Sequence, residues 1–378
     1  MRIGIDNISP GLSTSRNAVG GMRHFMETLV AGLPEAGHEH EFELFTPAWA
    51  DPFDTPAARR CVVVPDLRAP RNRVARAAYE QLRLPRRIAQ RALSVWLGTC
   101  NTLPLRAACR QVLIVQSLQF LSHADSYEGA RRRYQALLLR LSLKRADAIV
   151  ALSQASKDRI VELFATDPRR IHVIHHGLRF SNATPAGDRE ERERVLGLTG
   201  GEYVLSVSAF YPYKNFPRLI EAFARLKPTI KHRLVLIGAP TRFLTVEKVM
   251  AIARARGVEK DALCLGLVPG EELPKFYRNA AVLVMPSLEE TFGHPVLEAM
   301  AFGCPVVTSN RSSMPEIVGE AGVLVDPYSV DSIADGLDRV LSDTARQQQM
   351  AEAGVARARR FTREAFLSRL LRVLVGHD

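Results

Sequence analysis

Apolar residues follow two spacings along this chain, and the two alternate. Short runs that are apolar at every position are typical of strands covered by helices on both faces of a sheet. Between these runs, apolar residues recur every three or four positions, as expected of amphipathic helices. In the first half the pattern predicts strands at Arg2–Asp6, Glu41–Phe45, Cys61–Val64, Val112–Val115 and Ala148–Leu152, and helices at Met22–Leu33, Tyr134–Arg145 and Ala155–Phe164.

The second half repeats the alternation, with a polar stretch before it. The expected strands are Tyr203–Val207, Arg233–Ile237, Leu263–Leu265, Val282–Met285, Val306–Thr308 and Gly322–Val325. The expected helices are Pro217–Leu226, Val246–Arg256, Glu271–Asn279, Pro295–Phe302, Met314–Val318, Ser329–Leu341 and Thr362–Val375. Ser181–Arg194 is polar and lacks an apolar period, so we interpret it as a linker. The predicted fold class is α/β, with two Rossmann-like domains facing each other across a cleft at the carboxyl ends of their strands.

Composition fits this fold and excludes several others. The 378 residues are enough for two domains, and 47% hydrophobic with 24% charged residues is typical of a soluble globular protein. The start of the chain does not resemble a signal peptide, and no apolar run is long enough to predict a transmembrane helix. The five cysteines are scattered and form no C-x-x-C pair, so we expect no disulfide framework or zinc site and a cytoplasmic location.

The positive charge is concentrated in one region. The net charge is +11, yet residues 59–145 alone hold 18 Lys/Arg against 4 Asp/Glu, a balance of +14. A basic face suggests an anionic partner such as phosphate groups, a membrane surface or nucleic acid. Arg-rich helices that only solvate one face are an equally good explanation. Apolar and aromatic residues mixed with the arginines favour an anionic lipid surface, and no nucleic-acid-binding motif accompanies them.

The segment from Pro286 to Thr308 carries the clearest candidate chemistry. A short loop separates the strand Val282–Met285 from a helix expected to begin at Pro295 and to end at Gly303. The loop Glu290–His294 thus faces a helix N-terminus, whose unbonded N–H groups and partial positive charge suit a diphosphate. Glycine at position 293 lets a ligand approach the backbone closely.

Two glutamates lie eight positions apart in this segment. Glu290 can hold hydroxyls of a sugar, and Glu298 can accept hydrogen bonds from a pair of ribose hydroxyls. Periodicity alone allows a second explanation, in which both side chains merely favour the start of a helix.

The segment resembles the Glu-x7-Glu signature of the family-4 retaining glycosyltransferases, which have the GT-B fold. The match continues through Ser208-Ala-Phe-Tyr-Pro-Tyr-Lys-Asn, Leu234-Val-Leu-Ile-Gly, Leu265-Gly-Leu-Val-Pro-Gly and Ser312-Ser-Met-Pro-Glu-Ile-Val-Gly, and it covers nearly all of residues 200–345. The first half is similar more weakly, at Gly20-Gly21, Arg145-Ala-Asp-Ala-Ile-Val and Val173-Ile-His-His-Gly. The resemblance implies an acceptor domain at 1–180, a donor domain at 195–360, and a helix at 361–378 that packs back toward the first domain.

The resemblance also implies roles for individual residues. Lys214 would neutralise the nucleoside diphosphate leaving group, and Glu290 would bind the donor sugar. Glu298 would bind the ribose. Gly238 and Val268 would flank the base through backbone contacts. Further donor-site positions are Gly20, Gly21, Asn215, Thr291, Phe292, Gly293 and His294.

This chain departs from the family pattern at two positions. Ala209 stands where the family usually has an arginine, so one cation is missing or replaced, and Arg16 and Arg311 are candidate replacements. Gln116 stands where many members have a histidine on the acceptor side. An amide can donate a hydrogen bond, but it cannot act as an acid or base near neutral pH.

No metal or cofactor is expected. No Asp-x-Asp motif lies in a strand-end loop, and the adjacent His175 and His176 would point to opposite faces of a strand. The partners are then a nucleotide-sugar donor, which is a substrate, and a glycan or lipid-linked acceptor. An anionic membrane surface is a further partner through residues 59–145, with no nucleic acid. That places the protein in the cytoplasm or on the inner face of the membrane.

These features together predict a metal-independent hexosyltransferase that retains anomeric configuration, with GDP-mannose as the first donor to test. Its setting would be cell-surface polysaccharide assembly. Two alternatives stay open, namely a nucleotide-sugar epimerase or hydrolase on the same fold and a catalytically silent partner subunit.

Overall fold

A computed structural model of the chain describes residues 1–9, 21–51, 53, 60–66, 68–123, 129–180, 183, 184 and 187–376, without the side chains of residues 73, 130 and 131. The chain forms two compact units. Unit 1 consists of Met1–Gly177 together with Thr362–Asp378, and unit 2 consists of Leu178–Phe361. The last helix of the chain therefore belongs to the first unit.

Unit 1 is built on a seven-stranded sheet with the order β3-β2-β1-β4-β5-β6-β7. Every neighbouring pair is parallel, as predicted from the alternation of strands and helices. The strands are β1 (Arg2–Asp6), β2 (Glu41–Pro47), β3 (Val62–Asp66), β4 (Val95–Gly98), β5 (Arg110–Val115), β6 (Ala148–Ala151) and β7 (Ile171–Val173). The α-helices are α1 (Met22–Ala36), α2 (Arg73–Leu82), α3 (Leu84–Gln90), α4 (Gln119–Ser122), α5 (Gly129–Arg145), α6 (Gln154–Phe164) and α15 (Arg363–Val375).

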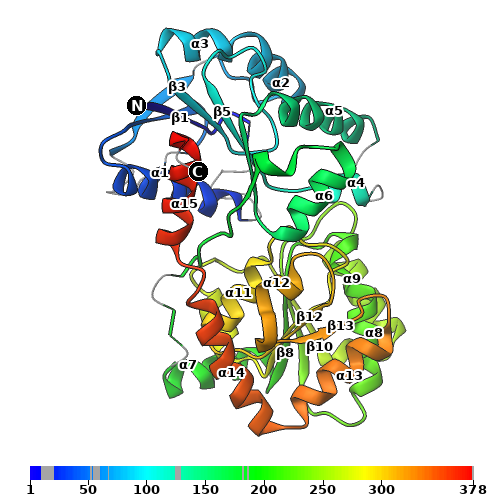
Figure 1. The fold of residues 1–378 in the computed structure, drawn as a ribbon. Helices are drawn as coiled ribbons and strands as arrows, with labels where there is room; N and C mark the ends of the chain where they lie inside the picture. The colour runs from blue at the N-terminus through cyan, green and yellow to red at the C-terminus, as the bar shows by residue number, and fades with distance from the viewer. Residues whose placement is uncertain are drawn as a thin grey trace. The chain divides into compact units, whose positions relative to one another are not determined.

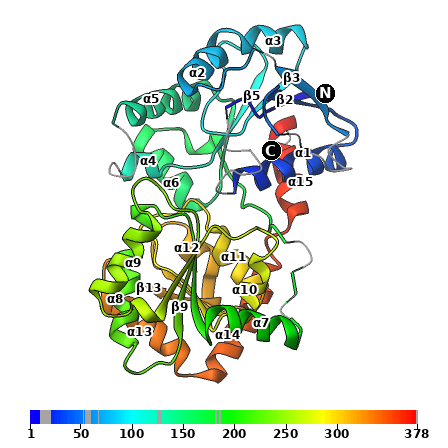
Figure 2. The ribbon, with the colours of Figure 1, turned by 180° about the vertical axis from the view of Figure 1, so that it is seen from behind.

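Helix α15 packs against α1 although the two lie at opposite ends of the sequence. The rings of Phe25 and Phe366 are 6.2 Å apart, and a side chain at Gly32 would collide with Leu367. Both views show the red C-terminal helix beside the blue N-terminal one (Figures 1 and 2). This contact completes the covering of the unit 1 sheet with residues taken from the end of the chain.

Unit 2 contains a six-stranded parallel sheet with the order β10-β9-β8-β11-β12-β13. Its strands are β8 (Tyr203–Val207), β9 (Arg233–Ile237), β10 (Ala262–Gly266), β11 (Val282–Met285), β12 (Val306–Ser309) and β13 (Val323–Val325). Its α-helices are α7 (Arg189–Thr199), α8 (Phe216–Leu226), α9 (Val246–Ala255), α10 (Leu273–Asn279), α11 (His294–Ala301), α12 (Met314–Val318), α13 (Val330–Leu341) and α14 (Thr344–Ala358). The chain runs outward from β8 in one direction and from β11 in the other, so the loops after these two adjacent strands lie at the switch point of the sheet.

The predicted linker was partly wrong, because residues 189–199 of unit 2 form helix α7. Asp188 caps this helix by accepting a hydrogen bond from the Glu191 backbone N–H at 2.6 Å. Glu191 is buried and forms an ion pair with Arg278 at 2.6 Å, while Val195 supplies the apolar contact. A helix fixed by a buried ion pair shows little hydrophobic period, so its sequence resembles a linker.

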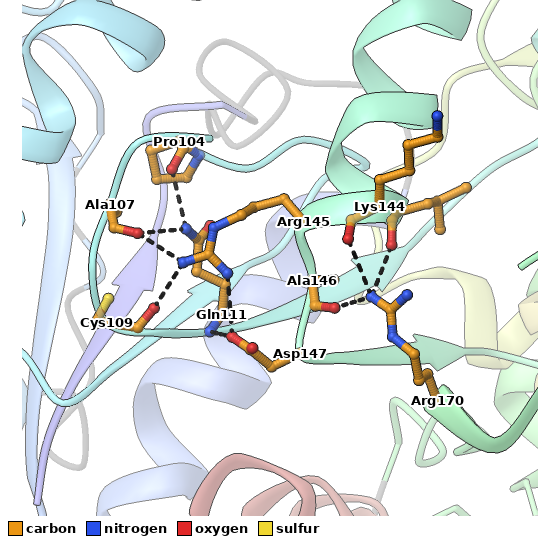
Figure 3. Close-up of polar contacts among 10 residues, drawn as sticks. Pro104, Ala107, Cys109, Gln111, Lys144, Arg145, Ala146, Asp147 and Arg170 are labelled. Carbon is orange, nitrogen blue, oxygen red and sulfur yellow. Dashed lines mark hydrogen bonds and ion pairs between the residues drawn. The ribbon is translucent and has the colours of Figure 1, made fainter. Parts of the chain in front are cut away.

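The junction of β5, α5 and β6 in unit 1 is closed by polar side chains (Figure 3). Arg145 donates to the carbonyls of Ala107 and Cys109 at 2.7 and 3.2 Å, and Arg170 donates to the carbonyl of Leu143 at 3.0 Å. Cations at the end of a helix satisfy its last carbonyls and interact favourably with its dipole. Part of the basic charge is therefore structural.

Candidate functional site

The loops after β8 and β11 bring Lys214 and Glu290 together. Because β8 and β11 are adjacent and parallel, their carboxyl ends lie at the same edge of the sheet. The Lys214 Nζ is 2.5 Å from the Glu290 Oε1, and the two side chains are only 14% and 9% exposed. A largely buried ion pair of this kind offers a cation and a carboxylate to one ligand, since a ligand anion can replace the carboxylate beside the ammonium group.

Asn215, the residue after Lys214, ties three loops of this edge together. It adopts the left-handed conformation with a φ of 67° and is buried. Its side-chain amide donates to the carbonyls of Pro286 at 3.0 Å and Pro327 at 2.6 Å, which follow β11 and β13. Asparagine tolerates positive φ better than most residues, and its amide can satisfy buried carbonyls. The position of Lys214 is therefore fixed from the loops around it.

The backbone of the Glu290 loop is held by two serines that follow β12. The Ser313 hydroxyl donates to the carbonyls of Glu290 and Phe292, both at 3.0 Å. The Glu290 N–H donates to the Ser312 hydroxyl at 3.2 Å. Phe292 is buried, so only its backbone can face a ligand, while Thr291 and His294 are half-buried.

Helix α11 begins at His294, one residue before the expected start, and Pro295 occupies its second position. Its N-cap is Gly293 with a φ of 102°, and a methyl group there would approach the Met314 Cε to 2.2 Å. Within the described residues no side chain caps this helix. Its partial positive charge is therefore directed at the loop that carries Glu290.

Glu298 lies one turn into α11 and is 5% exposed. The Tyr277 hydroxyl donates to its Oε2 at 2.8 Å. Burial raises the pKa of Glu298 to about 7, against the opposing effects of the Arg179 charge and of the Tyr277 hydrogen bond. Glu298 therefore titrates near neutral pH, and its carboxylate form can accept hydrogen bonds from ribose hydroxyls.

Gly238 and Val268 lie at the neighbouring strand ends. The Gly238 N–H donates to the Gly266 carbonyl at 2.8 Å, which joins the ends of β9 and β10. A side chain at Gly238 would meet the Ser208 carbonyl oxygen at 1.7 Å, so only glycine fits there. Val268 is half-buried in the loop after β10. The donor-site residues predicted in unit 2 thus surround one edge of one sheet, and their roles stay predictions.

Two family models match this chain in succession. "Glycosyltransferase Family 4" matches residues 19–182 and "Glycosyl transferases group 1" matches residues 188–357. O-antigen chain mannosyltransferase B of Escherichia coli is 31% identical over 259 residues, which are 68% of this chain and 67% of that protein. The chain belongs to the group 1 glycosyltransferases.

Solved structures with the same fold align with this glycosyltransferase over nearly its whole length. Sucrose-phosphate synthase from Thermosynechococcus elongatus has a TM-score of 0.82 at 20% identity and covers 100% of both chains. HepE of Anabaena, in complex with UDP and glucose, has a TM-score of 0.75 at 18% identity and covers 99% of both chains. The predicted GT-B fold with two Rossmann-like domains is confirmed. The chain spans about one third to two thirds of the length of the curated relatives that it matches.

The site residues expected in the first half of this glycosyltransferase lie in unit 1 or outside the described residues. Gly21 precedes α1 and accepts a hydrogen bond from the Phe25 N–H at 2.8 Å. Gln116 follows β5, and its buried Nε2 has no hydrogen-bond partner in the described part of the chain. Gly20 and Arg16 lie outside the described residues.

Of the two candidates for the missing cation, Arg16 and Arg311, only Arg311 lies within the described residues. Ala209 follows β8, as expected from its sequence position. Arg311 is exposed in the loop after β12, and its guanidinium lies 5.0 Å from the centre of the Tyr328 ring. None of these contacts places Arg311 beside Lys214. That Arg311 replaces the arginine missing at position 209 therefore stays a prediction.

Arg179 was not among the residues predicted from the sequence. It packs against Gly270 in the loop after β10, and its charge lowers the pKa of Glu298. The only indication of Arg179 in the sequence was that it directly follows Val173–Leu178, a segment that weakly resembles the glycosyltransferase family. The histidines of that segment follow β7 and do not lie on it, and the His176 ring packs 4.9 Å from Phe25 and 5.3 Å from Phe366.

The part of the chain that is described contains no group of three or more His, Cys, Asp or Glu side chains placed to hold a metal ion. None of its helices is both long and apolar enough to span a bilayer.

Proposed function

We propose that this glycosyltransferase moves a hexose from a nucleoside diphosphate sugar to a hydroxyl group, with retention of anomeric configuration and without a metal. The observation that carries the proposal is the Lys214–Glu290 pair, 2.5 Å apart beside the N-terminus of α11. In this proposal the diphosphate replaces Glu290 as the partner of Lys214, and the released carboxylate binds the hydroxyls of the sugar.

The same geometry explains how the reaction would be accelerated. Negative charge accumulates on the β-phosphate as the bond to the sugar breaks. A fixed ammonium group and a helix N-terminus stabilise that charge more in the transition state than in the ground state. Because Asn215 and the two serines hold the loops in place, little reorganisation is needed when the donor binds.

The donor and the setting are finer points of this proposal. The relative from E. coli is named as an O-antigen mannosyltransferase, which supports mannose as the sugar and polysaccharide assembly as the setting. HepE binds UDP and glucose, so the base and the sugar must be tested separately. GDP-mannose is the first donor to test.

Calorimetric titration with GDP, UDP and dTDP in the presence of EDTA tests the proposal. We expect one of them to bind without metal and Lys214→Ala to weaken that binding roughly ten- to hundredfold, because the variant removes a charged hydrogen bond to phosphate. Lys227→Ala is the matched control, since Lys227 forms its ion pair with Asp261. Failure of all three nucleotides to bind would refute the proposal.

A peripheral membrane location is part of the proposal, and helix α5 supports it. The helix contains no acidic residue, and where its side chains are described its exposed residues are Gly129, Arg133, Tyr134, Leu137, Arg140, Leu141 and Lys144. Leu137 is 56% exposed and Tyr134 is 43% exposed. From Arg133 to Lys144 the exposed residues recur every three or four positions, so cationic and apolar side chains share one face of the helix. That combination suits the surface of an anionic bilayer.

Sedimentation with phosphatidylglycerol vesicles tests this location. Replacing Arg133, Arg140 and Lys144 by glutamate should abolish binding, and phosphatidylcholine vesicles should bind little at physiological salt. Retained binding by the triple variant would exclude α5 as the docking face.

A catalytically silent subunit is the second candidate, and Ala209 and Gln116 motivate it. Transfer of sugar by the purified chain alone would exclude it. An epimerase or hydrolase would give product without an acceptor.

A further inference from the structure

Arg179 lies in unit 2 just after the chain leaves unit 1. The preceding residue is fixed there, because the Leu178 N–H donates to the Phe361 carbonyl at 2.8 Å. The Arg179 guanidinium carbon lies 5.0 Å from the centre of the Phe180 ring. A planar cation stacked on a ring is held in one orientation at little entropic cost.

The guanidinium packs directly on the loop after β10, where the base of a nucleotide is expected. A methyl group built on Gly270 would approach the Arg179 Nη2 to 2.0 Å. Glycine at this position therefore provides the space that the guanidinium fills. Val268, expected to flank the base, is two residues earlier in the same loop.

Arg179 also acts on Glu298, the residue expected to hold the ribose. Its charge lowers the pKa of Glu298, although no ion pair within 4 Å joins the two side chains. The other group beside Glu298 is Tyr277, which donates to Oε2. Cys304 is near Tyr277, and burial raises the pKa of its thiol to about 12, so it stays neutral at physiological pH.

Within the described residues, Arg179 has no acidic ion-pair partner. None of the carboxylates in the described part of the chain forms an ion pair with it, whereas Arg278 on the neighbouring helix is paired with Glu191. A half-buried cation without a counter-ion, placed between the base loop and a buried glutamate, is suited to donate hydrogen bonds to a ligand.

We propose that Arg179 determines nucleotide affinity: its guanidinium donates hydrogen bonds to the nucleoside end of the donor. Its charge has a second role, which is to keep Glu298 ionised so that it can accept hydrogen bonds from the ribose hydroxyls. This inference rests on the proposed function, and it names the residue that links the base loop to the ribose site. It predicts that Arg179 distinguishes a nucleoside diphosphate from pyrophosphate, which lacks the nucleoside.

Three variants separate the two roles. Arg179→Met removes both, Arg179→Lys keeps the charge but loses the planar fork, and Glu298→Gln removes the titrating group. Arg254→Met is the control, because Arg254 is an exposed arginine of the same unit that is paired with Glu259. Binding of the best nucleoside diphosphate and of sodium pyrophosphate is measured by calorimetry between pH 6 and pH 9.

At pH 7, Arg179→Met should bind the nucleoside diphosphate roughly ten- to hundredfold more weakly than the unmodified protein, the range expected for a charged hydrogen bond. Its affinity for pyrophosphate should be unchanged. Part of the lost affinity should return toward pH 9, where Glu298 ionises without Arg179. Arg179→Lys should be weakened but keep the pH profile of the unmodified protein, and Glu298→Gln should lose the dependence near pH 7.

An equal loss for nucleoside diphosphate and pyrophosphate would overturn the inference, as would an unchanged affinity of Arg179→Met at every pH. In both cases the unmodified protein still binds nucleotide, so the proposed function survives. If the unmodified protein binds no nucleotide, the proposed function fails and this inference fails with it.

Discussion

At the carboxyl edge of each sheet an asparagine holds the strand-end loops, but the other polar side chains differ between the two edges. In unit 2, Asn215 adopts a φ of 67° and bonds to the loops after β11 and β13. In unit 1, Asn101 follows β4 with a φ of 63°, donates to the Ser117 carbonyl at 2.8 Å and accepts from the Gln116 N–H at 2.7 Å. Each unit thus uses a left-handed asparagine to fix its strand-end loops.

The polar side chains at the two edges differ. In unit 2 Lys214 is paired with Glu290, and Tyr277 is bonded to Glu298. In unit 1 the Gln116 Nε2 is buried and, within the described residues, lacks a partner. Burial also raises the pKa of Asp6 to about 6 and of Glu80 to about 8, although the charge of Arg76 opposes both shifts.

This difference indicates that the two edges have different roles. Paired side chains on fixed loops are preorganised for one kind of ligand, which fits a donor whose diphosphate is always the same. Buried polar groups that lack partners cost stability and are most useful where a ligand completes them. The edge of unit 1 is therefore the place where we expect the acceptor specificity of this protein to reside.

The largest effect should come from Asn215→Ala. The change leaves two buried carbonyls without a donor and places alanine at positive φ, so we expect a loss of about 2–4 kcal/mol in the free energy of unfolding. Chemical denaturation measures it. Asn101→Ala, at the half-buried counterpart in unit 1, should cost about half as much. Equal losses, or a larger loss at Asn101, would show that the two edges are not held as described.

Glu80→Gln should change the pH dependence of stability. A carboxyl whose pKa is raised by folding stabilises the protein fully below its ordinary pKa of 4.5, and this contribution is lost as pH rises through about 8. The variant should therefore be more stable than the unmodified protein at pH 8.5, by about 1–3 kcal/mol, with little gain at pH 4.5. Unfolding curves across this pH range give the result, and an unchanged profile would exclude Glu80 as the titrating group.

The smallest expected effect is that of Gln116→Ala on the acceptor. Losing one neutral hydrogen bond should raise the KM for the acceptor about three- to tenfold and leave donor binding unaltered. Steady-state kinetics with varied acceptor measure this change. If the KM for the donor rose instead, the assignment of Gln116 to the acceptor side would be wrong.

Much of unit 2 could be predicted because most of its strands are uninterrupted apolar runs and most of its helices are amphipathic. Tyr203–Val207, Arg233–Ile237 and Val282–Met285 occur with the predicted bounds. The elements that escaped prediction have weak patterns: β4 and α4 are each four residues long, and α2, α3, α7 and α14 are rich in arginine, glutamate or glutamine. Their positions depend on contacts that are distant in sequence, such as the burial of the Trp96 side chain in the core of unit 1.

The sequence by itself determined the alternation of strands and helices, the parallel sheets, the motif around Glu290 and Glu298, and hence the family. These features follow from residue spacing, because strands and helices place side chains on one face at different fixed intervals along the chain. Only the tertiary structure decided that Lys214 meets Glu290 from 76 positions away, that residues 189–199 form helix α7, and that Arg179 packs against Gly270. The physical reason is that such contacts arise from the order of strands in a sheet and from the path of the chain between units, and neither leaves a period in the sequence.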